Sequence, residues 1–126
     1  MSTPLRVVAA VLLHDGRVLL GKRAPPRREA GSWEMPGGKV EAGETDEDAL
    51  VRELAEELGV EVRPVRLLAS VVHHYPHASI ELVAWECALV AGEPEAREHA
   101  ELRWLLPDEV PALPLAPADR ELWGRW

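Results

Sequence analysis

Several residue types are missing from this chain or nearly so. It has no asparagine, glutamine or phenylalanine, a single tyrosine, and one cysteine at position 87. Without side-chain amides, a polar ligand recognised by side chains must be bound by Arg, Asp, Glu, His, Ser or Tyr, or else by the backbone. Cys87 stands in an apolar run, which predicts a buried free thiol, and a lone cysteine excludes a disulfide within the chain. This usage is typical of a protein in the reducing cytoplasm.

Long hydrophobic runs are also absent. The longest, from Val7 to Leu13, is far shorter than the roughly 20 residues that cross a bilayer, and residues 1–4 lack the pattern of a signal peptide. We therefore expect no contact with membranes. The chain has 126 residues, of which 47% are hydrophobic, so we expect one folded domain over residues 1–126.

Positive charge is scarce: 14 basic residues stand against 22 acidic ones, giving a net charge of −8. A field of this sign repels long polyanions, which argues against duplex nucleic acid as a partner. A phosphate compound would need local cations at its site, supplied by fixed arginines or by a bound metal ion.

Hydrophobic patterning predicts several strands and one strong helix. The helix spans Thr45 to Leu58, with Thr45 as its N-cap and Gly59 as the residue that ends it. Residues 36–38, Pro-Gly-Gly, are expected to break regular structure, and a short helix is expected after Pro117. The strands are predicted at residues 6–13 and 17–22, joined by a hairpin turn, a short segment at 33–35, and residues 66–74, 79–90 and 101–105. This order favours an α/β fold with a mixed sheet between helices, an α/β/α sandwich.

Three glutamates share one face of the predicted helix. Glu53, Glu56 and Glu57 are spaced i, i+3 and i+4. They lie beside an apolar stripe of Leu50, Leu54 and Leu58, which is expected to face the core. They are either ordinary solvated glutamates or ligands of a cation. Repulsion across one turn, and the position of two of them at the negative end of the helix dipole, cost stability. A bound Mg²⁺ or Mn²⁺ would reverse that cost, because both ions prefer oxygen ligands.

Two neighbouring features complete this hypothesis. Gly37 and Gly38 let the backbone approach the carboxylates closely, so a carbonyl there can add a ligand. Arg52, which points away from Glu53, either holds a carboxylate or loop in place through its guanidinium fork or is a surface arginine.

At this point the sequence resembles the Nudix hydrolases, in particular the MutT-like branch with its 8-oxo-dGTP diphosphatases and bacterial CTP pyrophosphohydrolases. The Nudix box is matched at every defined position by Gly38-x5-Glu44-x7-Arg52-Glu53-Leu54-x-Glu56-Glu57-x-Gly59-Val60. Supporting similarity covers residues 31–41, 97–99 and 114–119. The resemblance implies a Nudix sandwich fold and Mg²⁺-dependent hydrolysis of a nucleoside triphosphate, (d)NTP, to (d)NMP and pyrophosphate, with water attacking the β-phosphorus.

The resemblance also implies roles for individual residues. The carbonyl of Gly37 and the carboxylates of Glu53, Glu56, Glu57 and Glu98 would bind the metal. Arg52 and Glu44 would orient the box. Glu53 is the favoured general base, with Glu98 as its competitor.

Substrate contacts are expected from four further residues. Arg23 and Lys39 are candidates for the phosphates, although Lys39 is equally typical of a solvated loop. Trp33 either stacks on a base or fills core volume. Asp119 stands where MutT-like enzymes place a base-reading residue; the alternative is that it caps the last helix.

Asp119 decides the expected substrate. An ionised aspartate only accepts hydrogen bonds, which favours amino or imino hydrogens and hence cytosine-type or modified nucleotides. A protonated one would also donate, so 8-oxo-dGTP is the leading rival and nucleotide pool sanitation the role that goes with it.

The sequence also allows a Nudix-fold binding module without catalysis. Such a module would be expected to have lost box carboxylates, and none is missing. His73, His74 and His77 are interpreted as turn residues rather than a zinc site, because no cysteines accompany them. A monomer or a homodimer fits equally well.

Overall fold

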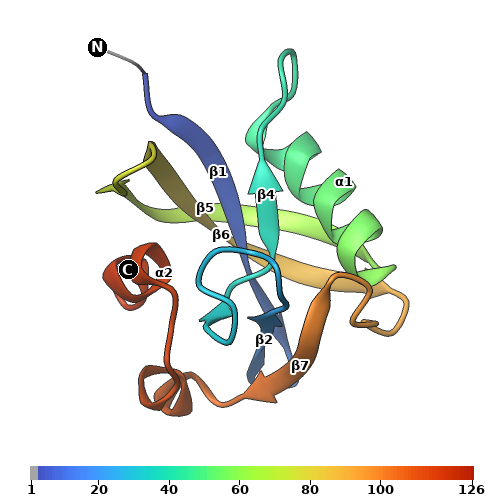
Figure 1. The fold of residues 1–126 in the computed structure, drawn as a ribbon. Coiled ribbons are helices and arrows are strands. Elements are labelled where there is room, and N and C mark those ends of the chain that lie inside the picture. Colours follow the sequence, from blue (N-terminus) through green and yellow to red (C-terminus); the bar gives the residue numbers. More distant parts are fainter. Residues whose placement is uncertain (1–2) are drawn as a thin grey trace.

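A mixed β-sheet forms the middle layer of the protein, and helices cover both of its faces (Figure 1). The structure is a computed structural model and describes residues 3–126. Helix α1 (Asp46–Leu58) packs on one face, and α2 (Pro117–Leu122) packs on the other, beside the 3₁₀-helix η1 (Pro107–Ala112). The predicted α/β/α sandwich with a mixed sheet is confirmed. No helix within residues 3–126 is long and apolar enough to span a membrane.

Seven strands occur within the described residues. They are β1 (Leu5–His14), β2 (Arg17–Arg23), β3 (Trp33–Glu34), β4 (Gly37–Lys39), β5 (Glu61–His74), β6 (Ser79–Ala91) and β7 (His99–Leu105). The main path runs β3-β2-β1-β6-β5, with β4 beside β1 and β7 beside β2. Strands β1 and β6 are parallel, and the other pairs are antiparallel.

Strands β1 and β2 separate soon after their hairpin. They pair only at Leu13 with Val18 and at His14 with Arg17. Beyond that point β4 pairs with β1 and β3 pairs with β2. The split lets β3 and β4 join the sheet, and β4 lies close to helix α1.

Two hydrophobic clusters lie on opposite faces of the sheet. On β1, Val8, Ala10 and Leu12 join the leucines of α1, while Ala9 and Val11 join α2 and η1. This alternation follows from the two-residue period of a strand. The prediction that the leucine stripe of α1 faces the core is confirmed, since all three leucines are fully buried.

The structure differs from the sequence-based prediction in three places. Residues 37–39 form β4 instead of breaking regular structure, because glycine lets a backbone lie close to both β1 and α1. Strand β5 begins at Glu61 and includes Pro64, which is tolerated at a register shift on an edge strand. The 3₁₀-helix η1 was not predicted. The other predicted strands and both helices are confirmed to within a few residues.

Helix α1 has the predicted ends. The backbone N–H of Asp48 donates to Oγ1 of Thr45 at 3.1 Å, and Gly59 adopts a left-handed φ of 70°. A positive φ favours glycine at this position. The caps fix where the carboxylate face of the helix starts and stops.

Thr45→Ala should lower the free energy of unfolding by about 1 kcal/mol, because it leaves the N–H of Asp48 without its acceptor. Urea denaturation followed by circular dichroism measures this change. Thr45→Ser keeps the hydroxyl and serves as the control. Equal losses for both variants would contradict a capping role.

Candidate active site

A cavity of about 200 Å³ lies where α1 faces β4. It is lined by Arg27, Gly37, Glu53, Glu57 and Glu98. Helix α1 supplies two of the carboxylates, and the chain just before β7 supplies the third. Four of the five residues predicted to bind a metal are thus brought together.

Glu56 lies outside this carboxylate cavity. Its side chain is 60% exposed, and its Oε2 atom lies 3.6 Å from the guanidinium of Arg52. Of the three glutamates predicted to converge, the structure therefore places two at the cavity and one at its solvent side. The expectation that Glu56 binds the metal stays a prediction.

Ionisation of Glu57 is unfavourable at this cavity. Burial, together with the nearby charges of Glu53, Glu34 and Glu98, raises the pKa of Glu57 to about 9. Its nearest imidazole nitrogen, Nε2 of His99, is 3.9 Å away. The carboxylate is therefore poorly compensated by the side chains around it.

The cavity fits a divalent cation by its chemistry. Three carboxylates face it, and Gly38 leaves so little space that a Cβ there would collide with the carboxyl group of Glu53. Mg²⁺ and Mn²⁺ prefer oxygen ligands of this kind, in a site whose ligands are acidic. Among the residues that the structure describes, no three acidic, His or Cys side chains are already arranged as a ligand group.

Arg52 holds the carboxylate side in place, which is one of its two predicted roles, but the prediction that it points away from Glu53 is wrong. Its Nε and Nη2 atoms donate to the two oxygens of Glu44 at 2.7 and 2.8 Å. Nη1 donates to Glu53 at 2.9 Å, and Nη2 also reaches the carbonyl of Lys39 at 3.1 Å. The hydrogen bonds from Arg52 hold the pKa of Glu44 at about 2. One guanidinium thus ties helix α1 to strand β4 and the loop that follows.

A second cavity, of about 230 Å³, adjoins the carboxylate cavity and shares Arg27 and Gly37 with it. We call it the middle cavity. Arg23, Lys39 and Asp119 all line it, so the structure brings these predicted substrate residues to one place.

Asp119 is buried at the apolar end of the middle cavity, with 5% of its surface exposed. Its Oδ1 accepts a hydrogen bond from the backbone N–H of Met35 at 2.9 Å. No side chain caps helix α2, so the capping alternative for Asp119 is wrong. Burial and the charge of Glu34 raise the pKa of Asp119 to about 7. Near neutral pH this carboxyl is therefore present in both accepting and donating forms.

Glu34 is a buried acceptor that organises the cationic side chains. It accepts from Nε of Arg23 at 2.7 Å, from Nη1 of Arg27 at 2.8 Å and pairs with Nε2 of His99 at 2.8 Å. Burial alone would raise the pKa of Glu34, but the hydrogen bonds from His99 and Arg27 outweigh it and bring the pKa to about 2. The ionised Glu34 thereby fixes both guanidinium groups beside the two cavities.

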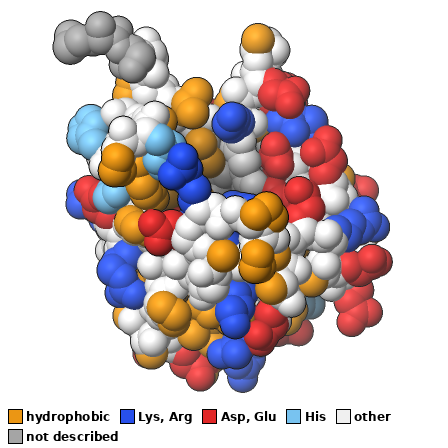
Figure 2. Space-filling model, viewed as in Figure 1, with side chains coloured by type: hydrophobic (Ala, Val, Ile, Leu, Met, Phe, Trp, Pro, Cys, Tyr) orange, Lys and Arg blue, Asp and Glu red, His pale blue; other side chains and the backbone are white. Residues whose placement is uncertain are grey.

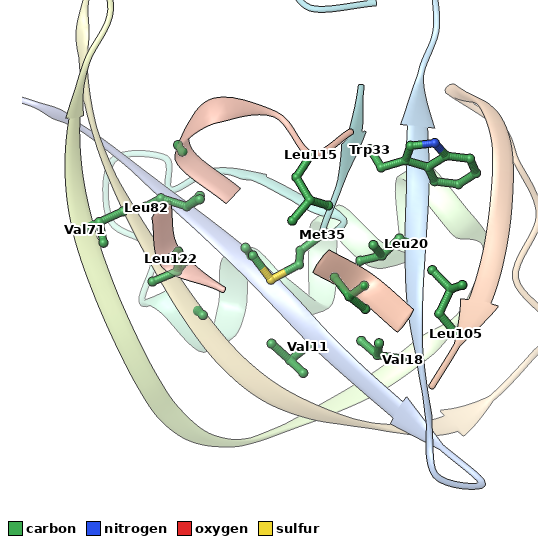
Figure 3. Packing of buried hydrophobic residues seen from close by; sticks show 14 residues of the cluster. Val11, Val18, Leu20, Trp33, Met35, Val71, Leu82, Leu105, Leu115 and Leu122 are labelled. Carbon is green, nitrogen blue, oxygen red and sulfur yellow. The ribbon is translucent and has the colours of Figure 1, made fainter. Parts of the chain in front are cut away.

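Trp33 does not lie at these cavities. It is 4% exposed and packs in the core with Leu20, Leu105 and Leu115 (Figure 3), and the guanidinium of Arg103 lies 4.8 Å from its ring centre. The structure therefore corrects the prediction that Trp33 stacks on a base. A chain without phenylalanine needs tryptophan to fill core volume.

Sequence reasoning missed Arg27, Glu34, His99 and Tyr75 as site residues. His99 and Glu34 stand 65 positions apart in sequence, so no local spacing connects them. Arg27 lies in a proline-rich loop among other arginines and carries no distinguishing pattern. Only the fold reveals these partners.

The third cavity, of about 430 Å³, is the outer cavity, which shares Arg23, Tyr75 and Ile80 with the middle one. The three cavities follow one another from the carboxylates of α1 to the β5–β6 hairpin. On the face shown in Figure 2, acidic side chains gather on the side of α1, and Lys or Arg side chains lie across a hollow from them. Along the three adjoining cavities the lining therefore changes from carboxylates to Arg and Lys side chains, and then to a mixture of polar and apolar groups.

Comparison with known proteins agrees with this geometry. A family model described as "NUDIX domain" matches residues 3–124. The chain is 44% identical over 115 residues to the CTP pyrophosphohydrolase of Escherichia coli K12, covering 91% of this chain and 85% of the relative. It is 34% identical over 122 residues to the 8-oxo-dGTP diphosphatase of Haemophilus influenzae, covering 96% and 90%. The solution structure of the E. coli ORF135 protein superposes with a TM-score of 0.83 at 42% identity, covering 94% and 85%.

Asp119→Asn should remove a pH dependence of stability. Since the pKa of Asp119 is about 7 in the folded protein against an ordinary value of 3.8, the folded protein keeps a proton that the unfolded chain releases between these values. Wild-type stability contributed by this group is therefore lost as pH rises from about 4 to about 7, and then stays level. Asparagine keeps an oxygen for Met35 and does not ionise.

The measurement is urea unfolding of both proteins at several pH values. As pH rises from about 4 to about 7, the free energy of unfolding of the variant should increase relative to that of wild type by a few kcal/mol, roughly 1.4 kcal/mol per unit of pKa difference. Asp15→Asn, at an 89% exposed hairpin position, is the control and should show no such trend. Parallel pH curves for wild type and Asp119→Asn would contradict the assignment.

Proposed function

Because this chain belongs to the NUDIX domain family, we propose that it is a metal-dependent pyrophosphohydrolase of nucleoside triphosphates, converting (d)NTP and water to (d)NMP and pyrophosphate. The family and the named relatives make it a hydrolase of pyrophosphate bonds in nucleotides. The choice of Mg²⁺ or Mn²⁺, the preferred base and the roles of single residues are our proposal.

One observation supports this function above the rest. A cavity lined by the carboxylates of Glu53, Glu57 and Glu98 adjoins one lined by Arg23, Arg27 and Lys39. The first suits a divalent cation and the second suits phosphate oxygens. A nucleotide whose pyrophosphate bond lies at the boundary would meet both kinds of group.

The proposed metal ligands are the carbonyl of Gly37 and the carboxylates of Glu53, Glu57 and Glu98, with Glu56 at the solvent side. When bound, a divalent cation supplies polarisation of the phosphoryl oxygens and a lowered pKa of a coordinated water. The arginines held by Glu34 offset negative charge on the phosphates as the bond breaks.

Either of two carboxylates can take the proton of the attacking water. Glu53 is our favoured general base, because Arg52 holds its carboxyl group in one orientation and β4 packs against it. Glu98 lines the same cavity from the chain just before β7 and is the competing candidate. Either group lies at the cavity where the water would be bound.

Asp119 supports a preference for cytosine-type nucleotides. Its ionised form accepts a hydrogen bond from an exocyclic amino group, and its protonated form donates to a ring nitrogen or carbonyl. A pKa of about 7 makes both forms available near neutral pH, which also keeps 8-oxo-dGTP as the alternative substrate and nucleotide pool sanitation as the alternative role.

A non-catalytic nucleotide-binding module is the second candidate function. The buried and uncompensated Glu57 argues against it, because binding alone gives no reason to keep a carboxylate that destabilises the fold. The single buried thiol of Cys87 supports a cytoplasmic location, and the net charge of −8 supports a small nucleotide rather than a duplex as partner. We propose a monomer or a homodimer of one domain.

Glu57→Gln should separate catalysis from stability. We expect kcat for dCTP to fall roughly 100-fold or more, since even the outer-shell partners of metal ligands cost 10- to 100-fold. In EDTA at pH 7 the variant should be more stable than wild type, because the unfolded chain ionises Glu57 while the folded site favours its neutral form.

The two measurements are pyrophosphate release and thermal unfolding with and without Mg²⁺. Added Mg²⁺ should raise the Tm of wild type but not of Glu57→Gln. Glu47→Gln, at an exposed position in the first turn of α1, is the matched control and should behave as wild type. A folded Glu57→Gln that hydrolyses dCTP at full speed would refute the proposed metal site.

A substrate panel tests the base preference. We expect kcat/KM to be highest for CTP, dCTP or 5-methyl-dCTP and lower for 8-oxo-dGTP and dATP. Asp119→Asn should shrink these differences, because an amide presents a donor and an acceptor at every pH. Equal kcat/KM for all five nucleotides in wild type would show that Asp119 does not select the base.

A further inference from the structure

Glu98 reaches the carboxylate cavity from residues 92–98, a segment between β6 and β7 that forms neither helix nor strand. Glu53 and Glu57 are positioned by helix α1, but Glu98 has no such support from its own segment. Its side chain is also exposed, so burial does not fix it. The position of this carboxyl group must therefore depend on the contacts of its neighbours in the chain.

Arg97 docks on the C-terminal end of helix α1. Its Nη1 atom donates to the carbonyl oxygen of Ala55 at 3.3 Å, and a Cβ at Gly59 would collide with its guanidinium. Two positions earlier, the backbone N–H of Glu95 donates to the carbonyl oxygen of Leu58 at 2.9 Å. The segment thus lies beside the end of α1 (Figure 1), attached to it by its backbone and by one long side chain.

The end of α1 that Arg97 covers is negative. Residues 55–58 include two glutamates and no Lys, Arg or His. The last carbonyl groups of a helix lack partners within the helix and form the negative end of its dipole, so a cation placed there is stabilising. In this chain the cation comes from residue 97, 42 positions after Ala55, and Gly59 leaves the space for it.

The residue after Glu98 is held separately. His99 begins β7, its side chain has no exposed surface, and its Nε2 atom lies 2.8 Å from the carboxylate of Glu34. Its ring packs so closely on β2 that a Cβ at Gly21 would collide with it. Consecutive Cα atoms are about 3.8 Å apart, so Glu98 is confined between an anchor in the sheet and an anchor on α1.

We propose that Arg97 is the positioning residue of Glu98, and that its docking on the end of α1 holds the Glu98 carboxyl group at the carboxylate cavity. The proposal rests on the proposed function for the part that Glu98 plays in hydrolysis, as metal ligand or as general base. Arg97 is not among the described residues that line the three cavities, so it acts on the reaction through its neighbour. Without Arg97, His99 would hold the segment from one side only.

The first test is a double-mutant cycle on the kcat and KM for dCTP. Arg97→Ala should lower kcat about 10-fold and leave KM within about 2-fold, because a displacement of about 1 Å near the reacting groups costs up to about 100-fold. In a Glu98→Gln background the same substitution should change kcat less than about 2-fold, because the group that Arg97 positions is already lost. A role in overall stability alone would lower kcat equally in both backgrounds.

Two single variants serve as controls for the cycle. Arg97→Lys keeps a cation at the end of α1 and should hold kcat within about 3-fold of wild type. Arg63→Ala removes an exposed arginine from β5 and should behave as wild type.

The second test uses the protein in EDTA, without nucleotide or turnover. The backbone N–H of Glu95 exchanges with solvent when its hydrogen bond to Leu58 opens, and NMR measures the rate of this exchange. Arg97→Ala should speed it about 5- to 10-fold, the range expected for losing one hydrogen bond and one cation at a helix end. Arg63→Ala should leave the rate unchanged.

Either of two results would overturn the inference: unchanged exchange at Glu95 in Arg97→Ala, or an equal loss of kcat in the wild-type and Glu98→Gln backgrounds. Failure of the proposed function has a different signature. Wild-type protein would then hydrolyse no nucleoside triphosphate, while the difference in exchange between wild type and Arg97→Ala would persist.

Discussion

The burial of one carboxyl group, that of Glu57, constrains the whole site. Its neighbours include two more carboxylates at the same cavity, and burial removes the water that would otherwise screen them. The fold keeps this unfavourable arrangement because α1 is anchored elsewhere, by its leucine stripe in the core, by its caps and by the guanidinium of Arg52. These anchors hold Glu57 in the site, although the protein without a bound metal ion would be more stable if this carboxyl group were absent.

The cationic side of the site is organised by the opposite arrangement. Glu34 is buried as well, yet two arginines and a histidine surround it, so its charge is compensated. Glu34 and Glu57 show that the effect of burial on an acidic residue depends on its partners, because the pKa of Glu34 is lowered and that of Glu57 is raised. One holds cationic groups in position for phosphate. The other favours its neutral form in the metal-free site and would lose its proton when a metal ion binds.

Much of the fold follows from local patterns in the sequence. The helix of residues 46–58, its Thr45 cap and its leucine stripe come from spacing within one segment. The fork from Arg52 to Glu44 joins two residues whose shared role followed only from the family resemblance. The convergence of Glu98 with α1 followed only from family resemblance, since nothing local relates residue 98 to residue 57. The pairings of Glu34 with His99 and of Asp119 with Met35 join distant segments and appear only in the folded chain. Trp33 shows that the sequence also leaves some roles undecided. Whether a tryptophan near a motif packs in the core or binds a ligand depends on tertiary contacts, which the sequence does not show.

The sheet divides the protein into two halves, with a separate hydrophobic cluster on each of its faces. The acidic half rests on the hydrophobic cluster under α1, and the half that carries Asp119 and Tyr75 rests on the cluster under α2. Only β1 and its neighbours in the sheet contribute to both. Distant substitutions with no shared contacts have nearly additive effects. Such a division lets natural variation reshape the pocket around one end of a substrate while the hydrolytic machinery at the other end stays intact, so a single scaffold can acquire new preferences by drift.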